Sequence, residues 1–313
     1  MLGRMLDPRS VARAHRGVCT AADLRDAGST RRAVEAAIAS GAIERVRRGV
    51  FVDPGMPLDM KRAVRVGGQL ACVSAARLHG LRVLTPPSEL HVAVDHHATR
   101  LRHADDVGRL LRAGDPSGGV RLHWTRETGP GAIVSLQTCL RQMLACVPEL
   151  DAICALDSAR ERVEWRPDRA ALLGQPAFER FTASLPRHLR RVAERSITGS
   201  QAIGETVARE ALGAAGIPVR AQVRLPGGYW ADLLIGERLI FEVDGETPHS
   251  LPGAFDRDRS RIGWLVAIGY EYVSYSHWQV LTDWGSIEAA LRLMLRRGSH
   301  RWDSIAARPV EFD

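Results

Sequence analysis

Lysine and long apolar runs are what this chain of 313 residues most clearly lacks. Lys61 is its only lysine, so any positively charged surface has to be built from arginine. No stretch approaches the roughly 18 consecutive apolar residues of a membrane-spanning helix, and the N-terminus has no long apolar segment typical of a signal peptide. We therefore expect a soluble, cytoplasmic protein that does not associate with a membrane.

Cysteine is sparse, and the sequence contains no C-x-x-C pair. The cysteines are odd in number and scattered along the chain: Cys19, Cys72, Cys139, Cys146 and Cys154. Such spacing argues against a zinc site or a disulfide framework and favours reduced thiols in the core. The middle histidines show no H-E-x-x-H or comparable ligand spacing. We expect them to be structural or exposed: His79, His91, His96, His97, His103 and His123.

Several catalytic fingerprints are absent as well. The sequence contains no Gly-x-Ser-x-Gly, Walker or dinucleotide-binding motif, so serine-hydrolase, ATPase and dehydrogenase functions lose their usual support. Hydrophobic residues make up 45% of the chain, enough for two or three domains with cores of their own. The formal net charge of +7 favours an acidic polymer as partner, nucleic acid first.

Residues 1–54 carry the pattern of a winged helix-turn-helix. Thr20 is placed to cap a first helix, and Ser29 or Thr30 to cap a second. A basic segment that resembles a β-hairpin follows. Helix, short turn, helix and two-stranded wing come in the order of this DNA-binding fold. The two helices and the hairpin are expected over these ranges: 21–27, 31–40 and 42–52.

The N-terminal segment is strongly basic, with ten arginines against six acids and a net charge of +4. That charge suits contact with a phosphate backbone, so we expect double-stranded DNA as the partner. The DNA-binding candidates begin the second helix and decorate the hairpin: Arg31, Arg32, Arg45, Arg47 and Arg48. The alternative is that the winged helix docks another protein.

The same segment resembles a known family. The runs Gly17-Val-Cys-Thr-Ala-Ala-Asp-Leu24, Ala27-Gly28 and Gly41-Ala-Ile-Glu-Arg-Val-Arg-Arg-Gly-Val-Phe-Val52 resemble the N-terminal domain of AbiEi-type antitoxins and their relatives. The resemblance implies binding to DNA, usually at an operator, and a toxin as a protein partner. Within the middle region, residues 55–190, Ser74-Ala-Ala-Arg-Leu-His-Gly80 also resembles AbiEi-like chains.

The middle region is expected to mix helices and strands. Apolar residues recur at helical spacing in four segments and alternate in two shorter ones. We expect helices over residues 59–67, 71–80, 135–145 and 152–161, and strands over residues 90–94 and 121–124. No biochemical role follows from this pattern.

The C-terminal region sets acids into two apolar strands, residues 230–235 and 239–243. Asp232 lies in the first, Glu242 in the second, and Asp244 directly after it. A buried carboxylate is costly unless a metal ion or another cation compensates it. Glu242 and Asp244 project from one face because they are two residues apart. Together with Asp232 they offer the oxygen ligands that Mg²⁺ prefers, and we predict a Mg²⁺ or Mn²⁺ site there.

Residues 191–313 are expected to form an α/β domain with the order helix, three-stranded meander, helix, strand, helix. That order is the core layout of the PD-(D/E)XK nucleases. Ser200 is placed to cap the first helix. The expected bounds are 200–213, 255–269 and 279–297 for the helices, and 222–225, 230–235, 239–243 and 270–275 for the strands.

Matching positions in these elements resemble the endonuclease-like domain related to very short patch repair enzymes. They are Glu205, Ala231-Asp-Leu-Leu-Ile235, Ile240-Phe-Glu-Val-Asp-Gly245, His249 and Phe255-Asp-Arg-Asp-Arg-Ser-Arg261. The resemblance covers roughly the last 115 residues. It implies metal-dependent hydrolysis of DNA phosphodiesters, and it assigns roles to individual residues.

By this resemblance, Asp232 and Glu242 would bind Mg²⁺, which polarises the scissile phosphate and activates a water molecule. His249 would act as the general base or orient the water. Glu205 would bind a second metal ion or position a ligand. Asp244 stands where many of these nucleases carry a lysine.

The helix after the second acidic strand supplies the remaining candidates. Arg259 or Arg261 would stabilise the charge of the phosphate in the transition state, with Asp258 holding the guanidinium. Besides Asp244, the sequence departs from the family at two places. Thr247-Pro-His249 stands where the family often shows a Tyr-His pair, and Ser274 stands where it often has an arginine.

Other interpretations stay open from the residues alone. Asp258 and Arg261 fit an ordinary i,i+3 helix pair, Asp244-Gly245 fits a turn, and Glu205 fits a surface position. We keep three hypotheses for function. The first is a metal-dependent DNA endonuclease positioned by the winged helix. The second is an antitoxin-like transcriptional regulator that binds its own promoter and keeps a catalytically degenerate nuclease fold. The third is a toxin-neutralising protein with no nucleic-acid role.

Overall fold

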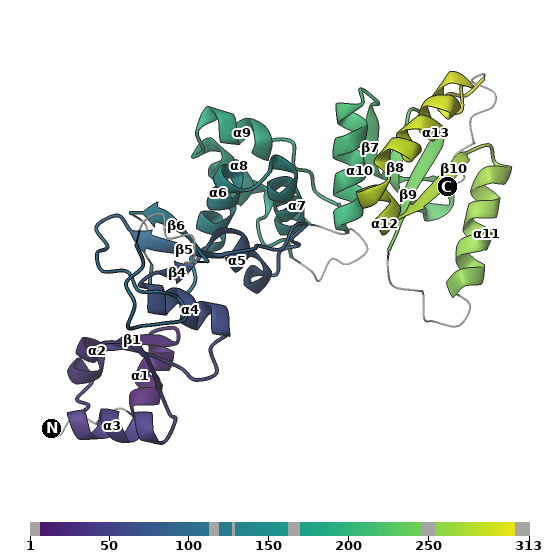
Figure 1. The fold of residues 1–313 in the computed structure, drawn as a ribbon. Coiled ribbons are helices and arrows are strands. Elements are labelled where there is room, and N and C mark those ends of the chain that lie inside the picture. Colours follow the sequence, from purple (N-terminus) through teal and green to yellow (C-terminus); the bar gives the residue numbers. More distant parts are fainter. Residues whose placement is uncertain (1–6, 113–118, 127–128, 162–169, 246–253, 304–313) are drawn as a thin grey trace. The chain divides into compact units, whose positions relative to one another are not determined.

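The computed structural model describes residues 7–112, 119–126, 129–161, 170–245 and 254–303. The chain divides into two compact units, Met1–Pro148 and Glu149–Asp313, both shown in Figure 1. The fold is mixed α/β, as predicted, with small sheets in each unit. Within the described ranges no helix combines the length and apolar character needed to cross a membrane.

The first unit begins with the predicted winged helix. Three short strands form an antiparallel sheet in the order β1-β3-β2. The hydroxyl of Thr20 accepts the amide of Asp23, whose carboxylate accepts the amide of Thr20 in return, and Thr30 rather than Ser29 caps the next helix. The elements are α1 (Pro8–Ala14), β1 (Val18–Thr20), α2 (Ala21–Asp26), α3 (Arg31–Ala39), β2 (Glu44–Arg47) and β3 (Val50–Val52).

A second, mixed sheet forms the rest of the first unit. Strand β5 lies in the centre of the order β4-β5-β6, antiparallel to β4 and parallel to β6. Its first five residues are buried, which explains its nearly continuous apolar sequence. The elements are α4 (Leu58–Val66), β4 (Gln69–Leu70), α5 (Cys72–Ala76), the 3-10 helix η1 (Arg77–His79), β5 (Leu90–Asp95), β6 (Val120–Thr125) and α6 (Leu136–Cys146).

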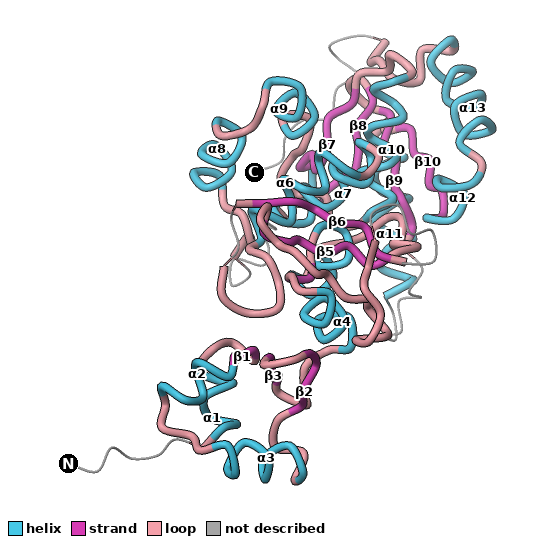
Figure 2. The backbone as a smooth tube through the Cα atoms, turned by 60° about the vertical axis from the view of Figure 1, so that its left-hand side comes forward, coloured by secondary structure: helices cyan, strands magenta, loops and turns pink. Residues whose placement is uncertain are grey.

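The second unit is built around a four-stranded sheet in the order β10-β9-β8-β7. Strands β7, β8 and β9 form the predicted antiparallel meander, and β10 joins the edge parallel to β9 (Figure 2). The strands are β7 (Val219–Arg224), β8 (Trp230–Ile235), β9 (Leu239–Asp244) and β10 (Glu271–Ser276), with a 3-10 turn η2 (Pro226–Gly228). The helices are α7 (Glu149–Arg160), α8 (Gln175–Ala183), α9 (Arg187–Ala193), α10 (Ile203–Ala214), α11 (Ala254–Ala267), α12 (His277–Thr282) and α13 (Trp284–Arg296).

Helices cover both faces of this sheet. On one face, Leu265 of α11 packs with Leu234 and Ile240. On the other, the ring of Phe241 contacts Trp284, which begins α13. Helix α10 packs on the second face as well. It lies so close to β9 that a Cβ atom added at Gly204 would be 2.7 Å from the Val243 side chain. The alternation along β9 therefore gives even-numbered residues to the α11 face and odd-numbered residues to the opposite face.

Three expected details were wrong. Ser200 does not cap α10, because the helix begins at Ile203 and the amide of Gln201 is bonded to the carboxylate of Glu205 instead. The expected helix 279–297 is two helices, α12 and α13, separated by the non-helical backbone of Asp283. Helix α8 was not anticipated at all.

Helices α7 and α8 and the start of α9 fall in the predicted middle region, 55–190, and all three helices are part of the second compact unit. Asp157 of α7 is fully buried and accepts hydrogen bonds from Thr206 and Arg209 of α10. This polar contact ties α7 to α10, the first helix that packs on the four-stranded sheet. The finer division into 1–54, 55–190 and 191–313 remains a prediction.

Candidate functional site

A row of polar residues crosses the four-stranded sheet of the second unit. Ala221 pairs with Leu233 and Val223 with Ala231, so Gln222 lies opposite Asp232. Leu233 pairs with Phe241, which puts Asp232 opposite Glu242 at the next step of the same register. Glu242 in turn pairs with Ser274 on β10. The sheet thus brings the two predicted metal-binding acids side by side from neighbouring strands.

Asp232 accepts hydrogen bonds and senses the charge of Arg261 without a direct ion pair among the described residues. Its Oδ2 accepts the amide of Val243 at 3.0 Å, and the side chain of Gln222 also hydrogen bonds to it. Burial and the negative charge of Glu242 raise the pKa of Asp232 from 3.8 to about 6, and the hydrogen bonds together with the charge of Arg261 oppose the rise. A carboxylate in this state gains from any cation that approaches it.

Glu242 has a cation already. It is 9% exposed, and both of its oxygens accept from Arg261 of α11, at 3.2 Å from Nη1 and 2.8 Å from Nη2. Arg261 also donates to Oδ1 of Asp258, at 2.9 Å from Nη2. Burial raises the pKa of Glu242, and the ion pair opposes that rise. In Arg261, burial lowers the pKa, but the pairing with Glu242 outweighs it and leaves the pKa raised.

Two residues that the sequence did not single out complete this site. The hydroxyl of Tyr272 lies 3.5 Å from Oε2 of Glu242. Burial and the charge of Glu242 raise the pKa of Tyr272, so the phenol remains a donor. Gln222 adopts a left-handed backbone conformation, φ +51°, which is uncommon for a residue other than glycine. The sequence offered only a weak signal for Tyr272: it and Ser274 are polar residues at alternate positions of an otherwise apolar strand.

Glu205 is part of the same network. It is 5% exposed, so the surface alternative is wrong: α10 turns this residue toward the sheet. Its Oε2 accepts from the amide of Gln201 at 2.9 Å and from Nε2 of Gln222 at 3.1 Å. Because Gln222 also bonds to Asp232, it connects the acid of α10 with the acid of β8.

Two of the remaining predicted residues, Asp244 and Arg259, are exposed. Asp244 is exposed at the end of β9, beside Ser276 of β10. Arg259 is exposed on α11, two residues before Arg261. His249 lies outside the described residues. The roles predicted for these three residues stay predictions.

The winged helix presents most of its predicted DNA contacts to solvent. Arg31 and Arg32 are exposed at the start of α3, and Arg31 pairs with Glu35 at 2.9 Å on the same helix. Arg45 and Arg48 are exposed on the wing. Arg47 is different, because its half-buried guanidinium packs against Gly67, where burial and the nearby Arg102 lower its pKa. The exposed arginines of α3 and the wing are the better candidates for phosphate contact.

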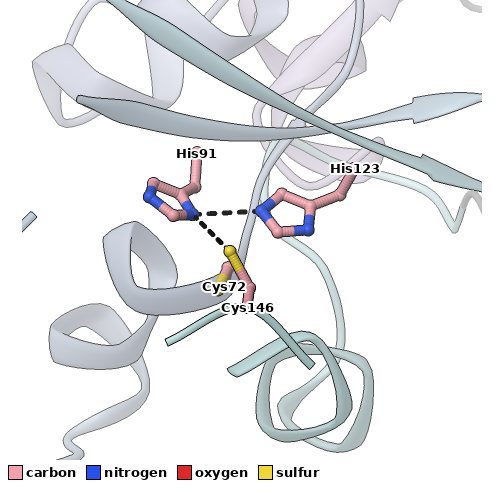
Figure 3. A group of neighbouring side chains, drawn as sticks. All are labelled: Cys72, His91, His123 and Cys146. Atoms are coloured by element: carbon pink, nitrogen blue, oxygen red, sulfur yellow. Dashed lines mark hydrogen bonds between the residues drawn. The ribbon is translucent and has the colours of Figure 1, made fainter. Parts of the chain in front are cut away.

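The first unit also holds a group that the sequence analysis had dismissed. Cys72, His91, His123 and Cys146 each bring one ligand atom to within 4.8 Å of the others (Figure 3). The five cysteines are free thiols, as expected, but two of them lie beside two histidines in a group that could hold a metal ion. The residues come from four elements, α5, β5, β6 and α6. Long sequence separations between ligands leave no recognisable motif.

Comparisons with known proteins support part of this description. No curated protein matches the chain. The catalytic domain of the homing endonuclease I-Bth0305I matches with 18% identity and a TM-score of 0.27, over 30% of this chain and 94% of that domain. Residues 7–52 match the family described as "Transcriptional regulator, AbiEi antitoxin". The N-terminal winged helix is therefore similar to an antitoxin-type regulator domain.

Proposed function

We propose that this protein is a DNA-binding regulator that contacts double-stranded DNA through its winged helix. The most direct support comes from residues 7–52. They match the antitoxin-type regulator family and fold as a winged helix with exposed arginines on α3 and the wing. The first turn of a recognition helix and a wing are the parts of this fold that reach DNA. A toxin is the protein partner expected of such a regulator.

DNA binding can be tested by fluorescence anisotropy over a range of salt concentrations. The duplexes are the region upstream of the protein's own gene and a scrambled duplex of equal length. Arg32→Ala should weaken binding to both and lower the slope of log affinity against log salt by about one. Arg292→Ala, an exposed arginine of α13, is the matched control. Equal losses from both substitutions would reject the winged helix as the contact.

A second candidate function is metal-dependent hydrolysis of DNA in the second unit. The observation that favours it is the pair Asp232 and Glu242, adjacent on β8 and β9, with the pKa of Asp232 raised by burial and by its neighbour. Two hard-oxygen ligands in this setting fit Mg²⁺ or Mn²⁺. A bound ion would polarise the phosphate and activate a water molecule.

The chain's own residues constrain how this would work. Arg261 holds both oxygens of Glu242, so metal binding there requires Arg261 to release at least one of them. The released guanidinium, still attached to Asp258, would be free to contact a phosphate oxygen. His249 is the proposed general base, and Glu205 acts through Gln222 to position Asp232.

Supercoiled plasmid incubated with Mg²⁺ or Mn²⁺ gives a direct test of hydrolysis. Nicking should disappear with Asp232→Asn and with Glu242→Gln, and it should persist with Glu288→Gln, an acid on α13 that pairs with Arg292. If neither metal supports cleavage while the protein binds DNA, the second unit is a scaffold and the regulator function stands alone.

A further inference from the structure

The first unit contains a candidate metal centre unrelated to the acids of the second unit. We propose that Cys72, His91, His123 and Cys146 bind a zinc ion that fastens α5 and α6 to the sheet of β5 and β6. Figure 3 shows the four side chains gathered together, with a ring nitrogen of His91 facing both His123 and the sulfur atom of Cys146. Nothing in the DNA-binding or nuclease proposals requires this group.

The distances suit a tetrahedral ion. Nδ1 of His91 lies 3.0 Å from Nε2 of His123 and 4.0 Å from Sγ of Cys146, and all four ligand atoms lie within 4.8 Å of one another. Zinc bonds of about 2.0–2.3 Å place tetrahedral ligand atoms about 3.3–3.8 Å apart. The four side chains therefore need only small adjustments to share one ion.

The fold, rather than the group itself, holds the ligands in place. In the parallel pair β5 and β6, His91 lies opposite Arg121 and His123 lies opposite Ala93, so the two histidines, offset by two positions, share one face of the sheet. The amide of His91 donates to Oγ of Ser74, just inside α5, at 3.0 Å. Their positions are fixed by strand pairing and by this contact with α5.

The two cysteines meet at helix ends. Cys72 is the first residue of α5 and Cys146 the last of α6. The amide of Cys72 donates to Oε1 of Gln142, one turn before Cys146 on α6, at 3.0 Å. Cys139, also on α6, donates its thiol to the carbonyl of Cys72. These bonds hold the start of α5 against α6 and keep both sulfur atoms beside the histidines.

The donor set identifies the metal class. Two thiolates and two neutral imidazoles are borderline-soft ligands that suit Zn²⁺ and are poor ligands for Mg²⁺. The complex would carry no net charge, which suits a place where Cys72 is fully buried and His91 is 5% exposed. Four protein ligands leave no open position, so the ion would be structural.

Metal content of the full-length protein is the first measurement. Purified without chelators or an affinity tag of histidines, it should carry about one zinc per chain by mass spectrometry of the metal. Cys146→Ser and His123→Ala should reduce this to near zero. Cys19→Ser, a buried cysteine in the winged-helix core, and His96→Ala, a histidine just after β5, are the controls and should leave it unchanged.

Cobalt gives a readout that does not depend on a variant folding. Added to the reduced, zinc-free wild-type protein, Co²⁺ should produce the visible bands of tetrahedral coordination and a thiolate-to-cobalt charge-transfer band, and Zn²⁺ should remove both. Absence of zinc together with absence of these bands overturns the proposal. So does a zinc-free protein that has lost two free thiols, since Cys72 and Cys146 would then be a disulfide.

Discussion

At the scale of single residues, Asp232 and Glu242 are neighbours with different sources of compensation. Asp232 accepts hydrogen bonds from Val243 and Gln222 and senses the charge of Arg261 only at a distance, whereas Glu242 is paired directly with Arg261. The difference matters because a hydrogen bond only moderates the energy of a buried charge, while an ion pair offsets much of it. The two acids should therefore respond differently to pH and to mutation.

Asp232 should make stability fall as pH rises. Its folded pKa, about 6, lies above its ordinary 3.8, so the folded state binds the proton more tightly and loses stability between about pH 4 and pH 6. The full effect is about 3 kcal/mol. Asp232→Asn lacks this titration, so urea unfolding without metal should show the variant gaining on wild type across that window. Parallel stability curves for the two proteins would contradict the prediction.

Arg261→Ala should destabilise the second unit strongly. It leaves Glu242 buried without its cation, a loss of about 3 kcal/mol. Arg292→Ala removes an arginine that is 48% exposed and pairs with Glu288, and it should change stability by less than about 0.5 kcal/mol. Thermal unfolding of both variants at pH 7 separates the cases. A small effect from Arg261→Ala would mean that Glu242 finds another partner.

The sequence revealed a site residue only where its chemistry contrasted with that of its neighbours along the chain. Asp232 and Glu242 stood out because acids interrupt apolar strands, and the pleat then predicted their common face. Gln222 and Tyr272 offered no such contrast, since both fit an ordinary strand. Cys72, His91, His123 and Cys146 were dismissed because no local spacing connects them. Only strand pairing and helix packing bring these four together.

At the scale of elements, hydrophobic periodicity predicted most of the helices and strands that pack together. The residues that cap the helices were predicted less accurately. β8 and β9 were predicted almost to the residue because turn residues flank short apolar runs. Ser200 failed as a cap because the carboxylate of Glu205 reaches back to the amide of Gln201. A side chain that acts from inside the helix cannot be distinguished in sequence from one that faces solvent.

Helix α7 also contains a buried polar residue that the sequence does not distinguish from an exposed one, and this residue supports a further prediction. It is buried from Asp151 to Arg160, and the buried carboxylate of Asp157 accepts from the amide of Ile197, from Thr206 and from Arg209. Asp157→Ala leaves these three buried donors without their acceptor and should lower the free energy of unfolding by about 3 kcal/mol. Glu149→Ala, on the same helix but 61% exposed, should be nearly neutral. Chemical denaturation of both variants tests this, and equal effects would refute it.

At the scale of the whole molecule, the chain forms two units that meet in sequence at Pro148 and Glu149. The sequence placed its boundaries at 54 and 190, where proline, glycine or basic runs occur. The link between α6 and α7 is only Val147 and Pro148, and a single proline between two helices does not distinguish a unit boundary from an ordinary helix-helix turn. What marks the boundary is the set of contacts each helix makes, and contacts are a property of the folded chain.

Residues 1–148 and 149–313 should each fold when expressed separately, because each has its own sheet and core. The first fragment should bind duplex DNA within about threefold of the full chain, a difference below 1 kcal/mol, and the second should bind it far more weakly. Circular dichroism and anisotropy measure both properties. DNA binding that requires the second fragment would contradict an N-terminal contact.

The pairing of Arg261 with Glu242 has a consequence for how such chains change over evolutionary time. Because this arginine neutralises the buried acid without any metal ion, the second unit does not rely on cofactor binding to remain folded. If the second unit hydrolyses DNA as proposed, descendants can lose that activity, for example through substitution of His249, without losing the domain. Selection for the folded domain alone would keep Arg261 and Glu242 together, whether or not the site cleaves DNA.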